Sequence, residues 1–229
     1  MNTLNIDIAK NQYDVKNFKG IAIVIDFFRF SSTVVALLQR GKRIKVFSDE
    51  KIALDFYKAN NNYDFFSERK IDIKKYDNSP YLAMTEDIKN DVIVLTNSGS
   101  KAVNACINAS VIIIATLSNI ESVKRYLSSK TDDVLIVPAY IFYDITNSED
   151  QIVAKHIADY LLSDSKIDVN ALKNEIEKTG RIDFLRRERD TADKDLEIIF
   201  SLNKFKVVPI ANIRGSYADV RDAVKKETL

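Results

Sequence analysis

The stretch IAIVIDFFRFSSTVVALLQRG, residues 21–41, decides the fold class. Its first five residues are all apolar, which is typical of a strand that is buried on both faces. Asp26 ends this run, and the apolar spacing over residues 32–40 predicts a helix. A buried strand that passes directly into a helix is the repeating unit of an α/β protein.

Similar strand and helix patterns alternate along the rest of the chain. Further strands are predicted at residues 43–47, 91–96, 110–116, 133–139 and 206–211. Further helices are predicted at residues 49–58, 101–108, 119–128, 149–162 and 193–202. We therefore expect an α/β fold with three layers, α/β/α, around a mostly parallel or mixed central sheet.

The length of 229 residues suits a single α/β domain, residues 1–229. The polar stretch SDSKIDVN, residues 163–170, interrupts the strand and helix alternation. We expect a helical insertion to start there and to cover about residues 164–202. One strand, residues 206–211, then returns to the sheet.

Composition argues against several classes of protein. Lys and Arg number 34 against 33 Asp and Glu, so a net charge of +1 gives no general attraction to nucleic acid. The longest apolar run, residues 109–117, is far shorter than the ~20 residues that span a membrane. The N-terminus lacks a signal-peptide pattern, and the single cysteine, Cys106, suits a reducing compartment. We expect a cytoplasmic protein without a membrane or nucleic-acid partner.

Polar side chains follow the first predicted strand, where ligands bind in covered α/β sheets. Asp26 could coordinate a hard cation through its oxygens, and the Arg29 guanidinium matches the geometry of a phosphate. Ser31, Ser32 and Thr33 lie at the start of the following helix, where free backbone N–H groups attract anions. The structural alternative is an Asp26–Arg29 ion pair, with Ser31 or Ser32 as an ordinary helix N-cap.

A second polar cluster, TNSGSK at residues 96–101, also joins a strand to a helix. Gly99 would let the backbone approach a phosphate, and Lys101 would add a positive charge. The spacing is not that of a Walker loop. Taken by itself, Ser100 as a plain helix cap explains the cluster at least as well.

Two further clusters look like helix starts. In DNSP, residues 77–80, Ser79 is the predicted N-cap and Pro80 the first helical residue. In TNSEDQ, residues 146–151, Ser148 and Gln151 form a capping box, and acidic residues favour a helix start through the helix dipole. The two acids there, Glu149 and Asp150, are also suitable Mg²⁺ ligands.

Taken in this order, the clusters resemble the motifs of the 2-phosphosulfolactate phosphatase family. The matching segments are Asp26-Phe27-Phe28-Arg29-Phe30-Ser31-Ser32-Thr33, Asn78-Ser79-Pro80, Thr96-Asn97-Ser98-Gly99-Ser100, Ser148-Glu149-Asp150, Gly180-Arg181, Asp195 and Val208-Pro209. They cover roughly residues 20–210 with family-like spacing.

The resemblance implies Mg²⁺-dependent hydrolysis of a small acidic phosphate ester, (R)-2-phospho-3-sulfolactate, on a three-layer α/β/α fold. We expect Asp26 to bind Mg²⁺ together with Glu149 or Asp150, and Arg29 to stabilise the phosphoryl group. Lys101 and Arg181 would offset the carboxylate and sulfonate charges. The other predicted substrate-binding residues are Ser31, Ser32, Thr33, Asn78, Ser79, Asn97, Ser98, Gly99 and Ser100.

The chain departs from the family pattern at several positions. Asp77 replaces a glycine before Asn-Ser-Pro, Phe30 replaces a small residue, and Pro138-Ala139-Tyr140 replaces Cys-Ala-Gly. Ser98-Gly99-Ser100 likewise stands for Asn-Gly-Thr.

Lost glycines reshape a ligand site, so the alternative function is a catalytically degenerate anion- or metabolite-binding module. A Rossmann-like nucleotide-binding protein is a second rival, although Gly-x-Gly-x-x-Gly is missing after the first strand. The sequence is also compatible with a homo-oligomer.

Overall fold

All the described strands form one nine-stranded mixed sheet in the computed structural model, which describes residues 5–60, 62–143, 149–163 and 165–224. Its order is β1-β7-β2-β6-β8-β9-β3-β5-β4. The strands are β1 (Ile6–Ile8), β2 (Ile21–Ile25), β3 (Ile44–Phe47), β4 (Tyr63–Phe66), β5 (Asp91–Leu95), β6 (Val111–Ile114), β7 (Val134–Pro138), β8 (Pro209–Arg214) and β9 (Tyr217–Asp222).

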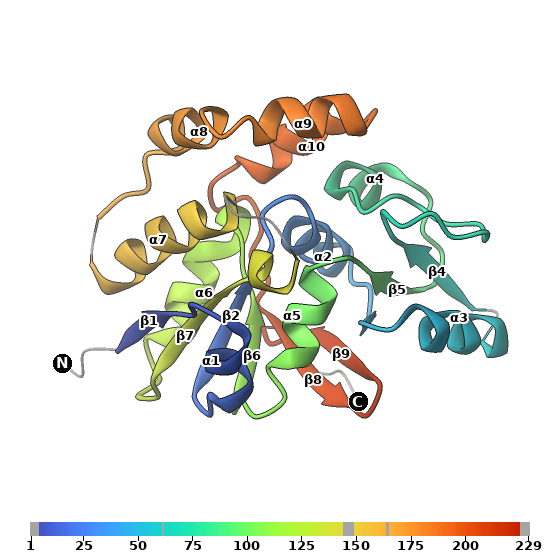
Figure 1. Cartoon of the computed structure of the whole chain (residues 1–229), viewed down its shortest axis with the longest axis horizontal. Helices are drawn as coiled ribbons and strands as arrows, with labels where there is room; N and C mark the ends of the chain where they lie inside the picture. The colour runs from blue at the N-terminus through green and yellow to red at the C-terminus, as the bar shows by residue number, and fades with distance from the viewer. Residues whose placement is uncertain (1–4, 61, 144–148, 164, 225–229) are drawn as a thin grey trace.

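Ten α-helices and two short 3₁₀ helices occur in the described residues (Figure 1). The α-helices are α1 (Gln12–Asn17), α2 (Phe30–Gln39), α3 (Glu50–Ala59), α4 (Pro80–Thr85), α5 (Gly99–Ala105), α6 (Ile120–Leu127), α7 (Glu149–Leu162), α8 (Val169–Glu177), α9 (Arg181–Glu188) and α10 (Ala192–Ile199). The 3₁₀ helices are η1 (Leu117–Asn119) and η2 (Ala139–Phe142).

Strand β2 shows how the three layers arise. Its side chains alternate between two separate cores because successive residues of a strand point to opposite faces. Ile21, Ile23 and Ile25 pack in the core that includes α6, α7 and α8, whereas Ala22 and Val24 pack in the core that includes α2 and α5. Helices therefore cover both faces, and the predicted three-layer α/β/α fold with a mixed sheet is confirmed.

The sheet consists of two parallel blocks joined by an antiparallel hairpin. Strands β1, β7, β2 and β6 are parallel to one another, as are β3, β5 and β4. The hairpin β8–β9 lies between the blocks and is antiparallel to both β6 and β3. Four strands separate β2 from β5 in the sheet, yet the loops that follow them are in contact, because Ser98 donates a hydrogen bond to Asp26.

Three strands differ from the sequence expectation. The chain returns to the sheet as the hairpin β8–β9 and not as one strand, because Gly215 adopts a positive φ of 64° at the turn after Arg214. Strands β1 and β4 were not predicted, because three or four residues with a charged side chain among them give little apolar signal. The six predicted strands and six predicted helices each have a counterpart, with ends shifted by a few residues.

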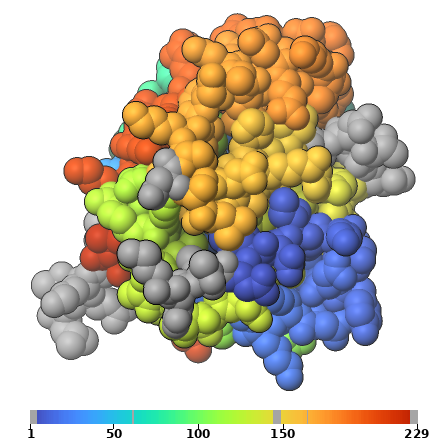
Figure 2. All heavy atoms as spheres, turned by 90° about the vertical axis from the view of Figure 1, so that its left-hand side faces the viewer, coloured from blue at the N-terminus to red at the C-terminus, as the bar shows by residue number. Residues whose placement is uncertain are grey.

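The segment between α7 and β8 contains the helices α8, α9 and α10, within the residues where the helical insertion is predicted. These helices lie together above the sheet in Figure 1, and Figure 2 shows them (orange) above α7 (gold). Ser148, the predicted cap of α7, lies outside the described residues. None of the helices within the described ranges combines the length and apolarity needed to cross a membrane.

Candidate active site

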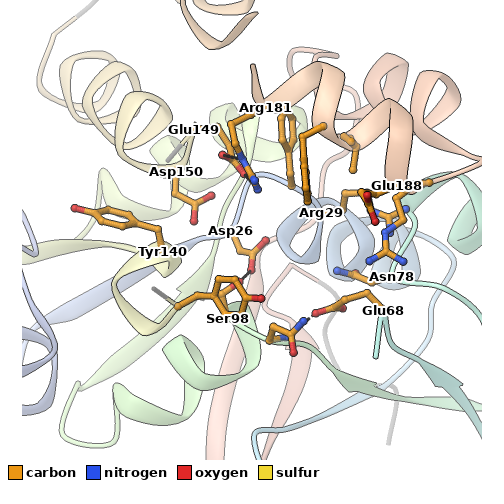
Figure 3. A pocket seen from close by; sticks show the side chains of 16 residues that line it. Asp26, Arg29, Glu68, Asn78, Ser98, Tyr140, Glu149, Asp150, Arg181 and Glu188 are labelled. Atoms are coloured by element: carbon orange, nitrogen blue, oxygen red, sulfur yellow. Dashed lines mark hydrogen bonds and ion pairs between the residues drawn. The ribbon is translucent and has the colours of Figure 1, made fainter. Parts of the chain in front are cut away.

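A cavity of about 190 Å³ lies where the loops after β2, β4, β5 and β7 meet the start of α7 and the underside of α9 (Figure 3). Five acidic and three arginine side chains are among its described lining residues. The lining residues are Asp26, Phe28, Arg29, Glu68, Asn78, Asn97, Ser98, Tyr140, Tyr143, Glu149, Asp150, Arg181, Phe184, Leu185, Glu188 and Arg189.

Asp26 is buried directly after β2 and is held by neutral donors. Its Oδ2 accepts a hydrogen bond of 2.6 Å from the Ser98 hydroxyl, and its Oδ1 accepts one of 3.2 Å from the Phe30 N–H. The Gly99 N–H also lies near enough to lower its pKa. Burial raises the pKa of the Asp26 carboxyl, and the charge of Glu149 raises it further against the lowering effect of these hydrogen bonds.

Gly99 allows this arrangement because its backbone passes very close to Asp26. A Cβ atom at this position would lie 2.4 Å from the Phe30 ring and 2.8 Å from Asp26 Oδ2. Phe30 itself packs in the core below the loop and does not line the cavity. The large side chain at position 30 is therefore not part of the cavity wall.

Asp150 is a second buried carboxyl group, in the first turn of α7. Its Oδ1 accepts a hydrogen bond of 2.7 Å from the Phe27 N–H, which follows Asp26 directly. Burial raises the pKa of Asp150 well above its ordinary value, and the charges of Asp26 and Glu149 add to this effect. Asp26 and Asp150 thus line the same cavity (Figure 3), near enough for the charge of Asp26 to raise the pKa of Asp150.

Glu149 and Arg181 form an ion pair at the top of the cavity in Figure 3. Arg181 Nε and Nη2 donate to the two Glu149 carboxylate oxygens at 2.8 and 3.2 Å. Burial lowers the pKa of Arg181, but Glu149 outweighs this effect and raises it above the ordinary value. This pair connects α7 to α9, which comes from the helical segment above the sheet.

Arg29 is held by two acids from distant parts of the chain. Its Nη1 donates to Asp195 Oδ2 at 2.6 Å and its Nη2 donates to Asp77 Oδ2 at 2.5 Å. The structural alternative, an Asp26–Arg29 ion pair, is therefore wrong, because Arg29 pairs with other acids. Arg29 also lines the cavity. Arg189 lies 3.6 Å from the other oxygen of Asp77.

The structure brings many of the predicted site residues together around this cavity. They are Asp26, Arg29, Asn78, Asn97, Ser98, Glu149, Asp150 and Arg181. Gly99 lies directly behind Asp26. These residues come from five separate segments, so the predicted meeting of strand exits occurs.

Three predicted phosphate-binding hydroxyls do not line the cavity. The Ser31 hydroxyl accepts from the Asp26 N–H at 3.0 Å, Ser32 pairs with Thr116 at 3.2 Å, and Thr33 donates to the Arg29 carbonyl at 3.1 Å. All three are buried inside the first turns of α2, which begins at Phe30. Because α2 starts earlier than the predicted helix, these hydroxyls lie inside the helix. They form hydrogen bonds within the protein.

Three other predicted substrate-binding residues, Ser79, Ser100 and Lys101, also lie outside the lining of the cavity. Ser79 caps α4, as its structural interpretation predicted, and donates to Asp195 at 2.5 Å. Ser100 exchanges hydrogen bonds with Thr96, and the N-cap of α5 is Ser98. Lys101 is exposed and lines a separate, open hollow that also includes Arg69 and Lys70.

Glu68 was missed from the sequence although it lines the cavity. It follows β4, which is short and contains a charged residue, so no strand exit was recognised there. The rule that polar residues after strands form ligand sites would have found it once β4 was known. Tyr140, Tyr143, Phe184 and Leu185 add an apolar part of the wall that no motif predicted.

A Mg²⁺ ion fits the chemistry of the buried carboxyl pair. Magnesium takes oxygen ligands and is usually held by one or two carboxylates together with substrate phosphate and water. In the described ranges, no group of three or more His, Cys, Asp or Glu side chains is arranged to hold a metal. Asp26 and Asp150 are buried carboxyl groups that could hold such an ion together with a substrate phosphate.

An α/β/α protein with buried carboxyl groups, an arginine and backbone N–H groups at converging strand exits has the features of an anion-handling hydrolase. The family model described as 2-phosphosulpholactate phosphatase matches residues 7–213 of the chain. The chain belongs to this family of phosphoric monoester hydrolases.

Several relatives are named probable 2-phosphosulfolactate phosphatase. A probable 2-phosphosulfolactate phosphatase of Thermoplasma volcanium is 28% identical over 198 residues, covering 85% of this chain and 90% of the relative. One from Clostridium tetani is 31% identical over 173 residues, covering 72% and 74%. One from Clostridium botulinum is 27% identical over 214 residues, covering 83% and 88%.

Proposed function

We propose that the chain is a Mg²⁺-dependent phosphomonoesterase that releases phosphate from 2-phosphosulfolactate or a similar small acidic phosphate ester. The observation that carries this proposal is the meeting of the buried Asp26 and Asp150 carboxyl groups at one cavity. The family match and the names of the relatives support the substrate class.

The balance of charges in the cavity supports the proposal that a Mg²⁺ ion binds there. Its described lining contains five carboxyl groups and three guanidinium groups. Arg29, Arg181 and Arg189 each already face a carboxylate. A multiply charged phosphate ester would be repelled from such a site unless a divalent cation entered with it. Asp26 and Asp150 would hold the Mg²⁺ ion, with Glu149 as a neighbouring carboxylate, and the ion would neutralise charge on the phosphoryl group.

The chain's own groups would stabilise the phosphoryl group in defined ways. Arg29 is fixed by Asp77 and Asp195, so its positive charge is already in place before substrate binds. Ser98 and Asn97 lie at the start of α5, beside Asp26. Arg181 on α9 would face the carboxylate and sulfonate end of the ester. The cytoplasmic location and a homo-oligomeric state stay predictions.

The test is phosphate release from 2-phosphosulfolactate and a panel of small phosphate esters, with Mg²⁺ or with EDTA. We expect release that EDTA abolishes, that added Mg²⁺ restores, and that Asp26→Asn reduces by about 10³-fold or more. The matched control is Asp87→Asn, because the Asp87 side chain is 83% exposed and lies outside the cavity lining. Phosphate release that is unaffected by EDTA would contradict the metal dependence. The absence of phosphate release from every ester would contradict the phosphatase activity.

One observation favours the second candidate, an anion- or metabolite-binding module of the same fold. Asp77 stands where the family pattern has glycine, and its carboxylate occupies Arg29 Nη2 at 2.5 Å. A guanidinium held in this way has fewer donors left for a phosphoryl group. Calorimetric binding of 2-phosphosulfolactate without phosphate release would favour the module, and turnover would exclude it.

A further inference from the structure

Glu68 has one carboxyl oxygen that is buried at the cavity and has no partner within the described residues. Its Oε1 accepts a hydrogen bond of 2.6 Å from the Asn97 N–H, which fixes the orientation of the carboxyl group. Its Oε2 is buried without a hydrogen-bond partner. Glu68 lines the cavity across from Asp150 and Tyr140 in Figure 3. A buried polar oxygen without a partner costs free energy unless a ligand or a proton satisfies it.

The surroundings of Glu68 favour its protonated form. Burial raises the pKa of Glu68, and the charges of Asp26 and Asp77 raise it further, against the lowering effects of the Asn97 N–H and of its own backbone N–H. Glu68 also borders the open hollow, whose other charged lining residues are Asp49, Glu50, Arg69, Lys70 and Lys101. Arg69 donates to the Thr96 carbonyl and pairs with Glu50. The Glu68 side chain therefore borders solvent on this side as well as the cavity.

The other acids of the cavity lining are less suited to donate a proton. Asp26 and Asp150 accept backbone N–H donors and are the candidate metal ligands. Both carboxylate oxygens of Glu149 already accept hydrogen bonds from Arg181. Glu188 is exposed to solvent on α9. Glu68 therefore differs from these acids in having a buried carboxyl oxygen that accepts no hydrogen bond from the described residues.

We propose that Glu68 is a catalytic residue, the proton donor to the leaving oxygen of the phosphate ester; this inference rests on the proposed phosphatase function. The bond between phosphorus and the alkyl oxygen breaks, and its electron pair stays on that oxygen. The Glu68 Oε2 proton forms the O–H bond of the released alcohol. Water supplies the new oxygen on phosphorus; one of its protons remains on hydrogen phosphate and the other restores the Glu68 carboxyl group.

The leaving group makes this role testable. The alkyl oxygen of 2-phosphosulfolactate must take up a proton as the phosphorus–oxygen bond breaks. The p-nitrophenolate group of p-nitrophenyl phosphate leaves readily without one. We expect Glu68→Gln to lower kcat/KM for 2-phosphosulfolactate by about 10²–10⁴-fold and to change it far less for p-nitrophenyl phosphate. The glutamine oxygen can still accept from the Asn97 N–H, so the fold should be kept. Glu197→Gln, an exposed glutamate on α10, is the matched control and should leave both rates unchanged.

A pH profile gives a second readout that needs no stable variant. For the wild type, kcat/KM with 2-phosphosulfolactate should fall as pH rises through the raised pKa of Glu68, and p-nitrophenyl phosphate should lack this fall. Equal losses for the two esters in Glu68→Gln, or an identical fall with both esters, would overturn the role of Glu68 while leaving the phosphatase intact. Absence of phosphate release by the wild type would instead overturn the proposed function, and the role of Glu68 with it.

Discussion

Arg29 Nη1 donates a hydrogen bond of 2.6 Å to Asp195 Oδ2 across 166 positions of sequence. Both side chains are buried, with 3% and 0% exposure. The same Asp195 carboxylate accepts from the Ser79 hydroxyl at 2.5 Å and from the Tyr81 N–H at 3.0 Å. One acid on α10 thus connects the loop after β2, the start of α4 and the helical segment above the sheet.

Removing this acid should loosen all three segments. Breaking a buried ion pair by deleting one partner leaves an uncompensated charge and costs about 3–5 kcal/mol. We expect Asp195→Ala to lower the free energy of unfolding by about this amount and to reduce activity by releasing Arg29. Urea unfolding measures the first effect. An exposed acid on the same helix gives the control, Asp193→Ala, with a change within about 0.5 kcal/mol. Equal stabilities of the two variants would contradict the connection.

Gly99→Ala should damage the site more than the fold. The new Cβ would lie 2.8 Å from Asp26 Oδ2 and 2.4 Å from the Phe30 ring, so one of them must move. We expect a loss of about 1–3 kcal/mol of stability and a larger fractional loss of kcat. Gly215→Ala is a control of similar cost, because its φ of 64° is strained for alanine but the residue lies on the β8–β9 turn. It should lose stability and keep kcat/KM in steady-state assays; similar activity losses in both variants would argue against the placement of Asp26.

The stability of the metal-free protein should depend on pH through Asp150. Its folded pKa is raised well above the ordinary value, so the folded state binds this proton more tightly than the unfolded chain does. Stability from this group is therefore present at low pH and is lost as pH rises toward the folded pKa. Denaturant unfolding between the ordinary carboxyl range and neutral pH, in EDTA, should show the wild type losing stability relative to Asp150→Asn. Added Mg²⁺ should reverse the trend for the wild type only, and parallel curves would contradict the prediction.

Arg181 should matter most for substrates with charge beyond the phosphate. We expect Arg181→Met to raise KM for 2-phosphosulfolactate by about tenfold, or ~1.4 kcal/mol, and to affect an uncharged alkyl phosphate much less. Arg186→Met is the control on the same helix, since Arg186 pairs with Asp193 on the exposed side. Steady-state kinetics with both esters separates the cases, and equal KM changes would show that Arg181 only supports Glu149.

Much of the fold could be predicted from local patterns. The run of residues 21–25, apolar on both faces, correctly indicated a strand covered by helices, and the Ser79-Pro80 pair correctly marked the start of α4. Strand β4 could not be predicted, because four residues with Asp64 among them carry too little apolar signal. Missing β4 also meant missing Glu68, which shows that an error in one short strand can remove a site residue.

The sequence by itself determined the layered fold, the family and the acidic and basic residues that are available for chemistry, because apolar periodicity and motif order are local properties of the chain. Only the tertiary structure decided which of these residues share a cavity. Ser31, Ser32 and Thr33 resemble phosphate ligands in sequence, yet their hydroxyls are used inside the start of α2. Asp77 and Asp195 lie far apart in the chain, yet both hold Arg29. Such partners depend on how the sheet brings strand exits together, which is a long-range property that no local pattern contains.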